Sequence, residues 1–201
     1  MRRCVRQHPD PELYEVKREQ LMEFENLAQN GHIDLFYGDE AAFCEQGYVP
    51  YGWQFQDEEV ALPARKSPSM HCIAFLSRTC KCYSRINERT IGADLVHETL
   101  DDFSFRLKKL TVLVLDNAAI HKTQKIKERL AIWQRRGLYL FYLPPYSPHL
   151  NIVEILWKQI KYHWLKPTDY AERETLRLAI YLAMNAVGKE LTINFSQSQI
   201  I

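Results

Sequence analysis

The sequence contains no apolar run that is long enough to cross a membrane. A membrane-spanning helix needs about 18 or more consecutive apolar residues, and none of the 201 residues begins such a run. The basic start of the chain is followed by Gln7-His8-Pro9-Asp10, where a signal peptide would become apolar. These two absences exclude a membrane protein and predict a cytoplasmic location.

Cysteine is scarce, and the number of cysteines is odd. The five cysteines are residues 4, 44, 72, 80 and 82, in a chain of which 46% is apolar. Such a chain can build a core without covalent staples, so we expect reduced thiols and no disulfide framework. Cys80 and Cys82 are two residues apart, as on one face of a strand, and lack the CxxC spacing typical of a zinc site.

The net charge of the chain is only +1, but the charged residues are unevenly distributed along the sequence. Residues 1–64 contain 5 Lys/Arg and 13 Asp/Glu, whereas residues 121–166 contain 9 Lys/Arg and 2 Asp/Glu. Such asymmetry is typical of a protein with a polyanionic partner. A solvated helix surface would give the same pattern, so charge alone leaves both interpretations open.

Hydrophobic spacing predicts one α/β domain. Asp10 followed by Pro11 indicates the start of a helix that runs to Gly31. Strands that first cluster and then alternate with helices predict a mixed sheet covered by helices. The predicted strands are 33–39, 70–76, 81–86, 112–115 and 138–143, and the predicted helices are 94–108, 121–136, 151–165 and 169–187. The domain boundaries are then a helical lead-in at 1–31, the domain at 32–188 and a C-terminal tail at 189–201.

Three acids lie at the ends of predicted elements. Asp39 ends the first strand, Asp116 directly follows the most apolar strand, and Glu154 opens a helix. Open sheets with helices gather their functional residues at strand ends. Three carboxylates without His or Cys ligands suit Mg²⁺ or Mn²⁺, and two such ions about 4 Å apart can clamp both oxygens of a phosphodiester displacement.

Each acid also has a purely structural explanation. Asp39 and Asp116 are suited to capping a following turn through their side-chain oxygens. Asn151 and Glu154 have the spacing of a helix capping box. Glu40 competes with Asp39 as the functional acid, because neighbours on a strand point to opposite faces. Spacing alone slightly favours the structural explanations.

The residues around the acids form longer motifs. These are Asp39-Glu40 after an apolar strand, the segment LDNAAIHK at 115–122 and the segment LPPYSPHLNIVEILW at 143–157. From about Asp10 to Val187, the chain resembles the catalytic domain of bacterial insertion-sequence transposases of the mariner superfamily, which are DDE endonucleases. The last segment is the most specific of the three.

This resemblance implies a ribonuclease-H-like fold with a five-stranded mixed sheet flanked by helices. Asp39, Asp116 and Glu154 would then bind two Mg²⁺ or Mn²⁺ ions, with Asp39 bridging them. The implied reaction is hydrolysis of a phosphodiester at the transposon end, followed by attack of the freed 3′-hydroxyl on target DNA, with insertion at TA dinucleotides. The implied partners are double-stranded DNA and a second copy in a homodimer, and the implied location is the cytoplasm, at the nucleoid.

The chain departs from the family pattern in three places. Ile152 stands where the family has proline, and His149 stands where it has an acid. No helix-turn-helix region that would read the element's ends precedes Asp39. We therefore expect an excised domain, a second reading frame or a truncated remnant. The alternatives are a DNA-binding or dimerising module without catalysis, and another ribonuclease-H-like nuclease.

Several polar and basic residues near the acids are candidate DNA contacts. Glu154, Lys158 and Lys161 share one face of a predicted helix, which would present an acid and two lysines together. His121 and Lys122 open another helix, where backbone N–H groups favour phosphate. Trp157 is expected in the core rather than as a base-stacking platform. The candidates are Asn117, His121, Lys122, Lys125, Arg129, Lys158 and Lys161, and a solvated helix face is the alternative for the basic ones.

Overall fold

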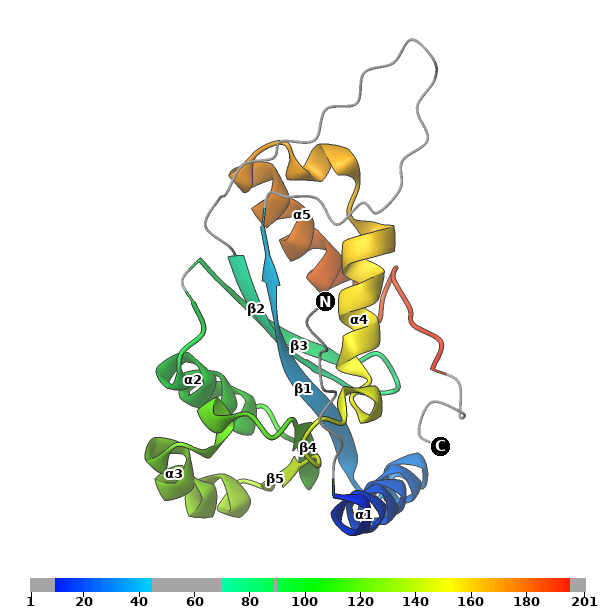
Figure 1. Ribbon diagram of the computed structural model, residues 1–201, viewed down its shortest axis with the longest axis vertical. Coiled ribbons are helices and arrows are strands. Elements are labelled where there is room, and N and C mark those ends of the chain that lie inside the picture. The colour runs from blue at the N-terminus through cyan, green and yellow to red at the C-terminus, as the bar shows by residue number, and fades with distance from the viewer. Residues whose placement is uncertain (1–9, 45–69, 89, 196–201) are drawn as a thin grey trace, which may run out of the picture.

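The computed structural model describes residues 10–44, 70–88 and 90–195, and its centre is one mixed sheet (Figure 1). The strand order is β3-β2-β1-β4-β5. The strands are β1 (Asp34–Phe43), β2 (Met70–Leu76), β3 (Cys82–Asn87), β4 (Thr111–Leu115) and β5 (Leu138–Tyr142). A five-stranded mixed sheet flanked by helices is the predicted architecture, and this prediction is confirmed.

Strand β1 is twice as long as its parallel neighbour β4. It pairs in parallel with β4 over residues 34–37 and antiparallel with β2 over residues 37–43. Asp39 therefore lies inside β1, and the prediction that it ends the strand is wrong. The strand continues because β2 still supplies partners after β4 has ended. Extending the β1–β4 register by two residues places Asp39 beside Asp116.

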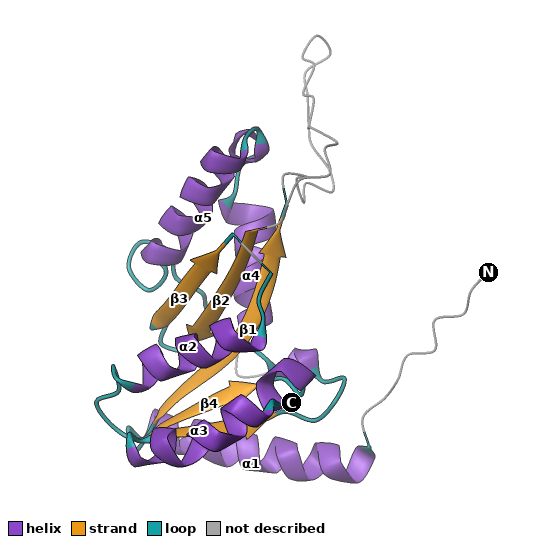
Figure 2. Cartoon of the chain, turned by 90° about the vertical axis from the view of Figure 1, so that its left-hand side faces the viewer, coloured by secondary structure: helices purple, strands orange, loops and turns teal. Residues whose placement is uncertain are grey.

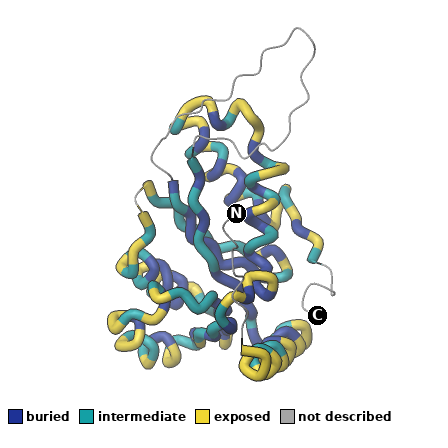
Figure 3. Tube along the Cα trace, in the orientation of Figure 1, coloured by how far each residue is buried: buried dark blue, intermediate teal, exposed yellow. Residues whose placement is uncertain are grey.

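Helices cover both faces of the sheet (Figure 2). One face carries α1 (Pro11–Gln29), α4 (Val153–Gln159) and α5 (Arg173–Ala186), and the other carries α2 (Ala93–Ser104) and α3 (Gln124–Arg135). Two separate hydrophobic clusters result. The first includes Leu21 and Leu156, and the second includes Leu100 and Trp133. The buried residues follow the strands between the helical layers (Figure 3).

The alternation of side chains along β1 places Asp39 and Glu40 on opposite faces of the sheet. Leu35 and Tyr37 belong to the cluster under α1, α4 and α5, whereas Phe36 belongs to the cluster under α2 and α3. Because strand side chains alternate, Asp39 faces the first layer and Glu40 the second. A single strand thus delivers one acid to each side of the sheet.

Helix α1 packs against the sheet and is hydrogen-bonded to it. The side chain of Asp10 accepts hydrogen bonds from the backbone N–H groups of Glu12 and Leu13, which confirms the predicted start. Glu25 is buried, accepts a hydrogen bond from Arg78 Nε at 2.6 Å and another from the Tyr37 hydroxyl. A buried carboxylate is tolerated here because both partners satisfy it.

Several predicted helix boundaries are wrong. The helix predicted at 121–136 is a 3₁₀ turn, Ala119–Lys122, followed by α3 after an extended residue at Thr123. The helix predicted at 169–187 is likewise a 3₁₀ turn, Pro167–Tyr170, followed by α5. Helix α2 ends at Ser104 and not at residue 108 as predicted. The Ser104 hydroxyl donates a hydrogen bond to the carbonyl of Asp101. Helix α4 continues as predicted, but as a π-helical turn, Ile160–Trp164.

The cysteines of the described residues are free thiols. Cys80 lies in the β2–β3 turn with φ of 58°, so the prediction that it shares a strand face with Cys82 is wrong. A tight turn here brings Cys80 against the end of α5, where its Sγ accepts a hydrogen bond from the Ile193 backbone N–H at 3.3 Å. Over the same described ranges, no helix is both long and apolar enough to span a membrane.

Gly31 and Gly188 provide a matched test of this packing. Both follow a helix with nearly equal positive φ, 75° and 77°, but an added Cβ meets nothing at Gly31 and lies 2.2 Å from the Cys80 carbonyl oxygen at Gly188. We expect Gly31→Ala to lower the free energy of unfolding by about 1 kcal/mol, from backbone strain alone. Gly188→Ala should cost roughly 2–4 kcal/mol, because the clash adds to the strain. Urea unfolding of both variants measures this, and equal losses would contradict the close approach.

Candidate active site

The three predicted acids come from three different elements and line one pocket. Asp39 of β1, Asp116 after β4 and Glu154 in the first turn of α4 face a cavity of about 390 Å³. The loops that follow β4 and β5 form the rest of its wall, including Asn117 and Tyr146. The sequence motifs at 115–122 and 143–157 thus meet at the point where β1 passes the end of β4.

Two hydrogen bonds fasten the start of α4 to β1 on either side of this pocket. Asn151 Nδ2 donates to the Gly38 carbonyl at 3.0 Å, and Trp157 Nε1 donates to Asp39 Oδ2 at 2.9 Å. Asn151 and Glu154 do not form the capping box that their spacing allows, because the N-cap of α4 is Ile152 and the Asn151 Oδ1 accepts from the backbone N–H of Val153, at 3.2 Å. Asn151 is buried, and its amide joins the first residue of the helix to the strand that carries Asp39.

Asp39 is the most perturbed of the three acids. Burial, together with the negative charges of Glu40 and Glu154, raises the pKa of this carboxyl to about 7. Hydrogen bonds from the Glu40 backbone and from Trp157 act in the opposite direction but are outweighed. A carboxyl group in this position holds a proton near neutral pH unless a positive charge takes the proton's place.

Asp116 has the opposite electrostatic environment. Its Oδ1 accepts a hydrogen bond from the Ala118 backbone N–H at 3.0 Å and lies 2.8 Å from His121 Nδ1. The hydrogen bond from His121 is the main cause of a pKa below the usual range for this carboxyl. The turn-capping explanation for Asp116 is therefore correct, and the same side chain also lines the pocket.

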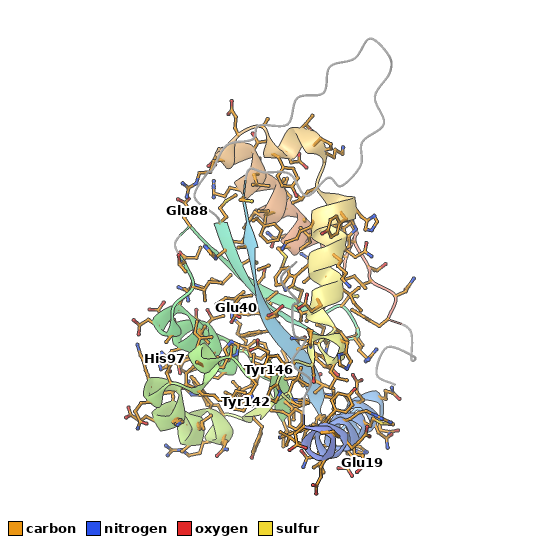
Figure 4. The ribbon with its side chains drawn as sticks, viewed as in Figure 1. Glu19, Glu40, Glu88, His97, Tyr142 and Tyr146 are labelled. Atoms are coloured by element: carbon orange, nitrogen blue, oxygen red, sulfur yellow. The ribbon has the colours of Figure 1, made fainter. Side chains whose placement is uncertain are left out.

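His121 lies between two carboxylates. Its side chain is fully buried, and Nε2 lies 2.8 Å from Glu40 Oε1 on the side opposite Asp116. Burial lowers the pKa of His121, but the hydrogen bonds and charges of Asp116 and Glu40 outweigh it and raise the pKa to about 10. The Tyr142 hydroxyl donates to the His121 carbonyl at 2.8 Å. Glu40 and Tyr142, both labelled in Figure 4, thus contact this residue through its ring and its backbone.

The prediction that the His121 side chain contacts DNA is wrong, because that side chain has no exposed surface. The 3₁₀ turn and the extended Thr123 replace the expected continuous helix and turn the ring inward. The sequence offered one signal for the observed role, since His121 follows Asp116 at a five-residue spacing within a single motif.

The remaining candidate DNA contacts fall into two groups. Lys122 and Lys158 are exposed, and Lys161 is half-buried, with a pKa that burial lowers and the charges of Glu154 and Asp39 partly restore. Lys125 and Arg129 instead pair with acids of α2: Lys125 Nζ lies 2.6 Å from Asp94, and Arg129 lies 3.2 Å from Asp101. For these two, the structure favours the alternative of a helix surface paired within the fold.

Sequence reasoning missed the site roles of Trp157 and Tyr146, and it named Asn117 only as a candidate DNA contact. Trp157 is buried, as expected, but its indole N–H also holds Asp39. Asn117 lines the pocket, and its Oδ1 is buried with no hydrogen-bond partner in the described part of the chain. Tyr146 is 59% exposed at the pocket with φ of 59°, an uncommon conformation for a side chain of this size.

The donor set of the pocket is chemically suited to a hard divalent cation. All three acids offer oxygen, and they line the same pocket. Within the described ranges, no group of His, Cys, Asp and Glu has the close spacing of a preformed metal site. The residues therefore fit Mg²⁺ or Mn²⁺ by chemistry, and a cation would have to draw them together.

Comparisons with solved structures support the fold. The chain is similar to the Mos1 transposase in a paired-end complex with the left transposon end, at a TM-score of 0.64 and 12% identity, over 100% of this chain and 61% of that one. It is also similar to the catalytic domain of the Mos1 mariner transposase, at a TM-score of 0.61 and 12% identity, over 98% of this chain and 91% of that one. A simian T-cell lymphotropic virus intasome matches at a TM-score of 0.56 and 12% identity, over 80% of this chain and 50% of that one.

At these identities the likeness shows the fold, which is ribonuclease-H-like. The chain spans about three fifths of the transposase chain in the paired-end complex, 61% by length. A sequence search against curated proteins gave no match. A sequence profile of the DDE superfamily endonucleases, in contrast, matches residues 34–177, a range that contains Asp39, Asp116 and Glu154. With this match covering most of the sequence, the chain belongs to the DDE superfamily endonucleases.

Proposed function

We propose that this chain is the catalytic domain of a DNA transposase, which hydrolyses a phosphodiester at the transposon end and then joins the freed 3′-hydroxyl to target DNA. The observation that carries the proposal is the convergence of Asp39, Asp116 and Glu154 on one pocket. Membership of the DDE superfamily endonucleases supports it, as do similar structures described as Mos1 transposase complexes with transposon ends, with Mn or with Mg.

Asp39, Asp116 and Glu154 would hold the divalent cations, two Mg²⁺ or Mn²⁺ ions with Asp39 shared between them. Such ions, when bound, polarise the phosphate and stabilise the attacking and leaving oxygens of the displacement. The chain's own contribution is to position the acids. Trp157 fixes one oxygen of Asp39, and Asn151 fixes the strand beside it.

Double-stranded DNA is the proposed substrate, and its phosphates would approach the exposed basic residues next to the pocket. Lys158 lies one helical turn beyond Glu154 and is exposed, and Lys122 is exposed beside the turn that carries His121. Lysines attract the DNA backbone by charge, without reading its sequence. Asn117 lines the same pocket, where its amide N–H₂ group is a possible donor to a phosphate. Assembly as a homodimer, insertion at TA dinucleotides and an origin in a bacterial insertion sequence remain parts of the proposal.

The first prediction concerns strand cleavage. Asp116→Ala and Glu154→Gln should each reduce Mn²⁺-dependent nicking of supercoiled plasmid by at least about 100-fold, because a metal ligand contributes several kcal/mol and 1.4 kcal/mol is a factor of ten. A matched control is Glu98→Gln, whose side chain is 57% exposed on α2 and outside the pocket. This control should nick as fast as the wild type.

Nicking that survives in Asp116→Ala would contradict the assignment of the three acids. A folded wild-type chain that binds DNA but does not nick it would favour the alternative of a DNA-binding module. Cleavage of branched DNA in preference to transposon ends would favour another ribonuclease-H-like nuclease.

A second prediction concerns pH. Because the pKa of Asp39 is raised to about 7 in the folded protein, from 3.8, folding retains a proton on this group, and its contribution to stability is lost as pH rises from about 4 to 7. Asp39→Asn removes the titrating carboxyl group, so the variant does not lose this stability as the pH rises. In metal-free buffer the variant should therefore gain stability over the wild type with rising pH, reaching on the order of a few kcal/mol at pH 8.

Urea unfolding at pH 5 and pH 8 with a chelator measures this difference. The control is Asp102→Asn on α2, whose side chain is 60% exposed and should show no comparable gain. Adding Mn²⁺ at pH 8 should stabilise the wild type more than Asp39→Asn, because a carboxylate binds the ion more strongly than a neutral amide oxygen does. A difference between Asp39→Asn and wild type that does not change with pH would show that Asp39 is not held protonated.

A further inference from the structure

The contact between Glu40, His121 and Asp116 joins residues from two different strands through one buried ring. Glu40 belongs to β1, and Asp116 directly follows β4. Both ring nitrogens of His121 lie 2.8 Å from a carboxylate oxygen. Each ring nitrogen thus has a carboxylate oxygen within hydrogen-bond distance, so the ring is held at both ends.

Exposure differs sharply along this contact. The His121 side chain is 0% exposed, that of Glu40 is 22% exposed and that of Asp116 is 48% exposed. The ring is therefore the buried anchor, and Asp116 is the end that faces the pocket. The Tyr142 hydroxyl fixes the backbone of His121 from β5, so the anchor is held at both its ring and its main chain.

The two hydrogen bonds to the Asp116 side chain are made to the same oxygen. Oδ1 accepts from the Ala118 backbone N–H at 3.0 Å and from His121 Nδ1 at 2.8 Å. Among the described residues, Oδ2 has no such contact, so it is left to a ligand in the pocket. A carboxylate that is fixed through one oxygen presents the other in a defined direction.

Glu40 is placed to act through His121 and not in the pocket itself. Its side chain leaves β1 on the face that carries α2 and α3, whereas Asp39 leaves on the face that carries α4. The residues that line the pocket include Asp39 and not Glu40. Resting on the proposed function, we propose that Glu40 and His121 are positioning residues that orient the Asp116 carboxylate for a divalent cation.

The test is Mn²⁺ binding to the full chain, measured without DNA from the electron paramagnetic resonance signal of free Mn²⁺. Two amide substitutions separate the two ends of the ring. In His121→Asn the amide reaches the position of Nδ1 and keeps a donor for Asp116, whereas in His121→Gln it reaches the position of Nε2 and loses that donor. His121→Gln should weaken Mn²⁺ binding by about 10- to 100-fold and His121→Asn by clearly less. The control His163→Gln replaces an exposed histidine and should bind as the wild type does.

A double-mutant cycle then identifies the route by which Glu40 acts. If Glu40 works through the ring, Glu40→Ala weakens Mn²⁺ binding on its own but adds nothing to the loss in His121→Gln. Additive losses would mean that Glu40 acts independently of the His121 ring, and would overturn the proposal. Wild-type affinity in both His121→Gln and Glu40→Ala would overturn it as well. Thermal melts identify any variant that does not fold, and if His121→Gln is one, Glu40→Ala compared with Glu40→Gln, which retains an acceptor, carries the test.

Failure of this inference is distinguishable from failure of the proposed function. If Asp116→Ala abolishes nicking while His121→Gln binds Mn²⁺ like the wild type, the transposase proposal stands and the positioning role does not. If Asp116→Ala changes neither Mn²⁺ binding nor nicking, the proposed function itself fails, and the positioning role fails with it.

Discussion

Strand β1 continues past the end of its parallel neighbour β4, and the candidate site depends on this difference in length. Over residues 34–37 the two strands pair, and beyond them β1 is held by β2 on its other side. The polypeptide after β4 is then free to turn away, which opens a space beside Asp39. Asp116, the first residue beyond β4, and the start of α4 close this space from two sides. A β4 of equal length would fill the pocket with paired backbone.

The acids that meet in this space are electrostatically unequal. Asp39 is half-buried near the negative charges of Glu40 and Glu154 and has a raised pKa, whereas Asp116 receives hydrogen bonds and has a lowered one. One carboxyl group therefore holds a proton where its neighbour remains charged. Strongly shifted pKa values cluster at functional sites, where burial and nearby charges act on the same groups. Holding the Asp39 carboxyl near other negative charges lowers the free energy of unfolding. The packing of the two hydrophobic clusters must offset this loss.

Much of the fold and the membership of the pocket followed from the sequence alone. Apolar runs such as 112–115 predict buried strands whatever their partners, and the acids that follow such runs lie at one edge for simple topological reasons. Glycines at the ends of helices were equally informative, since Gly31, Gly137 and Gly188 all have positive φ. The motifs at 115–122 and 143–157 added the family.

Other features depended on tertiary contacts that no local pattern encodes. His121 was expected at the surface because the sequence from 121 to 136 reads as one helix. The break at Thr123 and the partner on β1 are decided by packing. Lys125 and Arg129 were expected to meet DNA because they belong to a basic stretch of the sequence. The acids that pair with them, Asp94 and Asp101, come from a separate helix. The length of β1 was underestimated because its second half is paired only with β2.

The hydrogen bonds that join α4 to β1 connect residues that are far apart in the chain. Asn151 and Gly38 are separated by 113 positions, and Trp157 and Asp39 by 118. Asp39 is therefore synthesised long before the helix that completes its surroundings. A nascent or proteolysed chain that ends before α4 contains two of the three acids but lacks both the third and the contacts that orient the first. The order of residues along the chain thus makes the site one of the last features to be assembled, and a fragment that retains most of the sheet has no complete site.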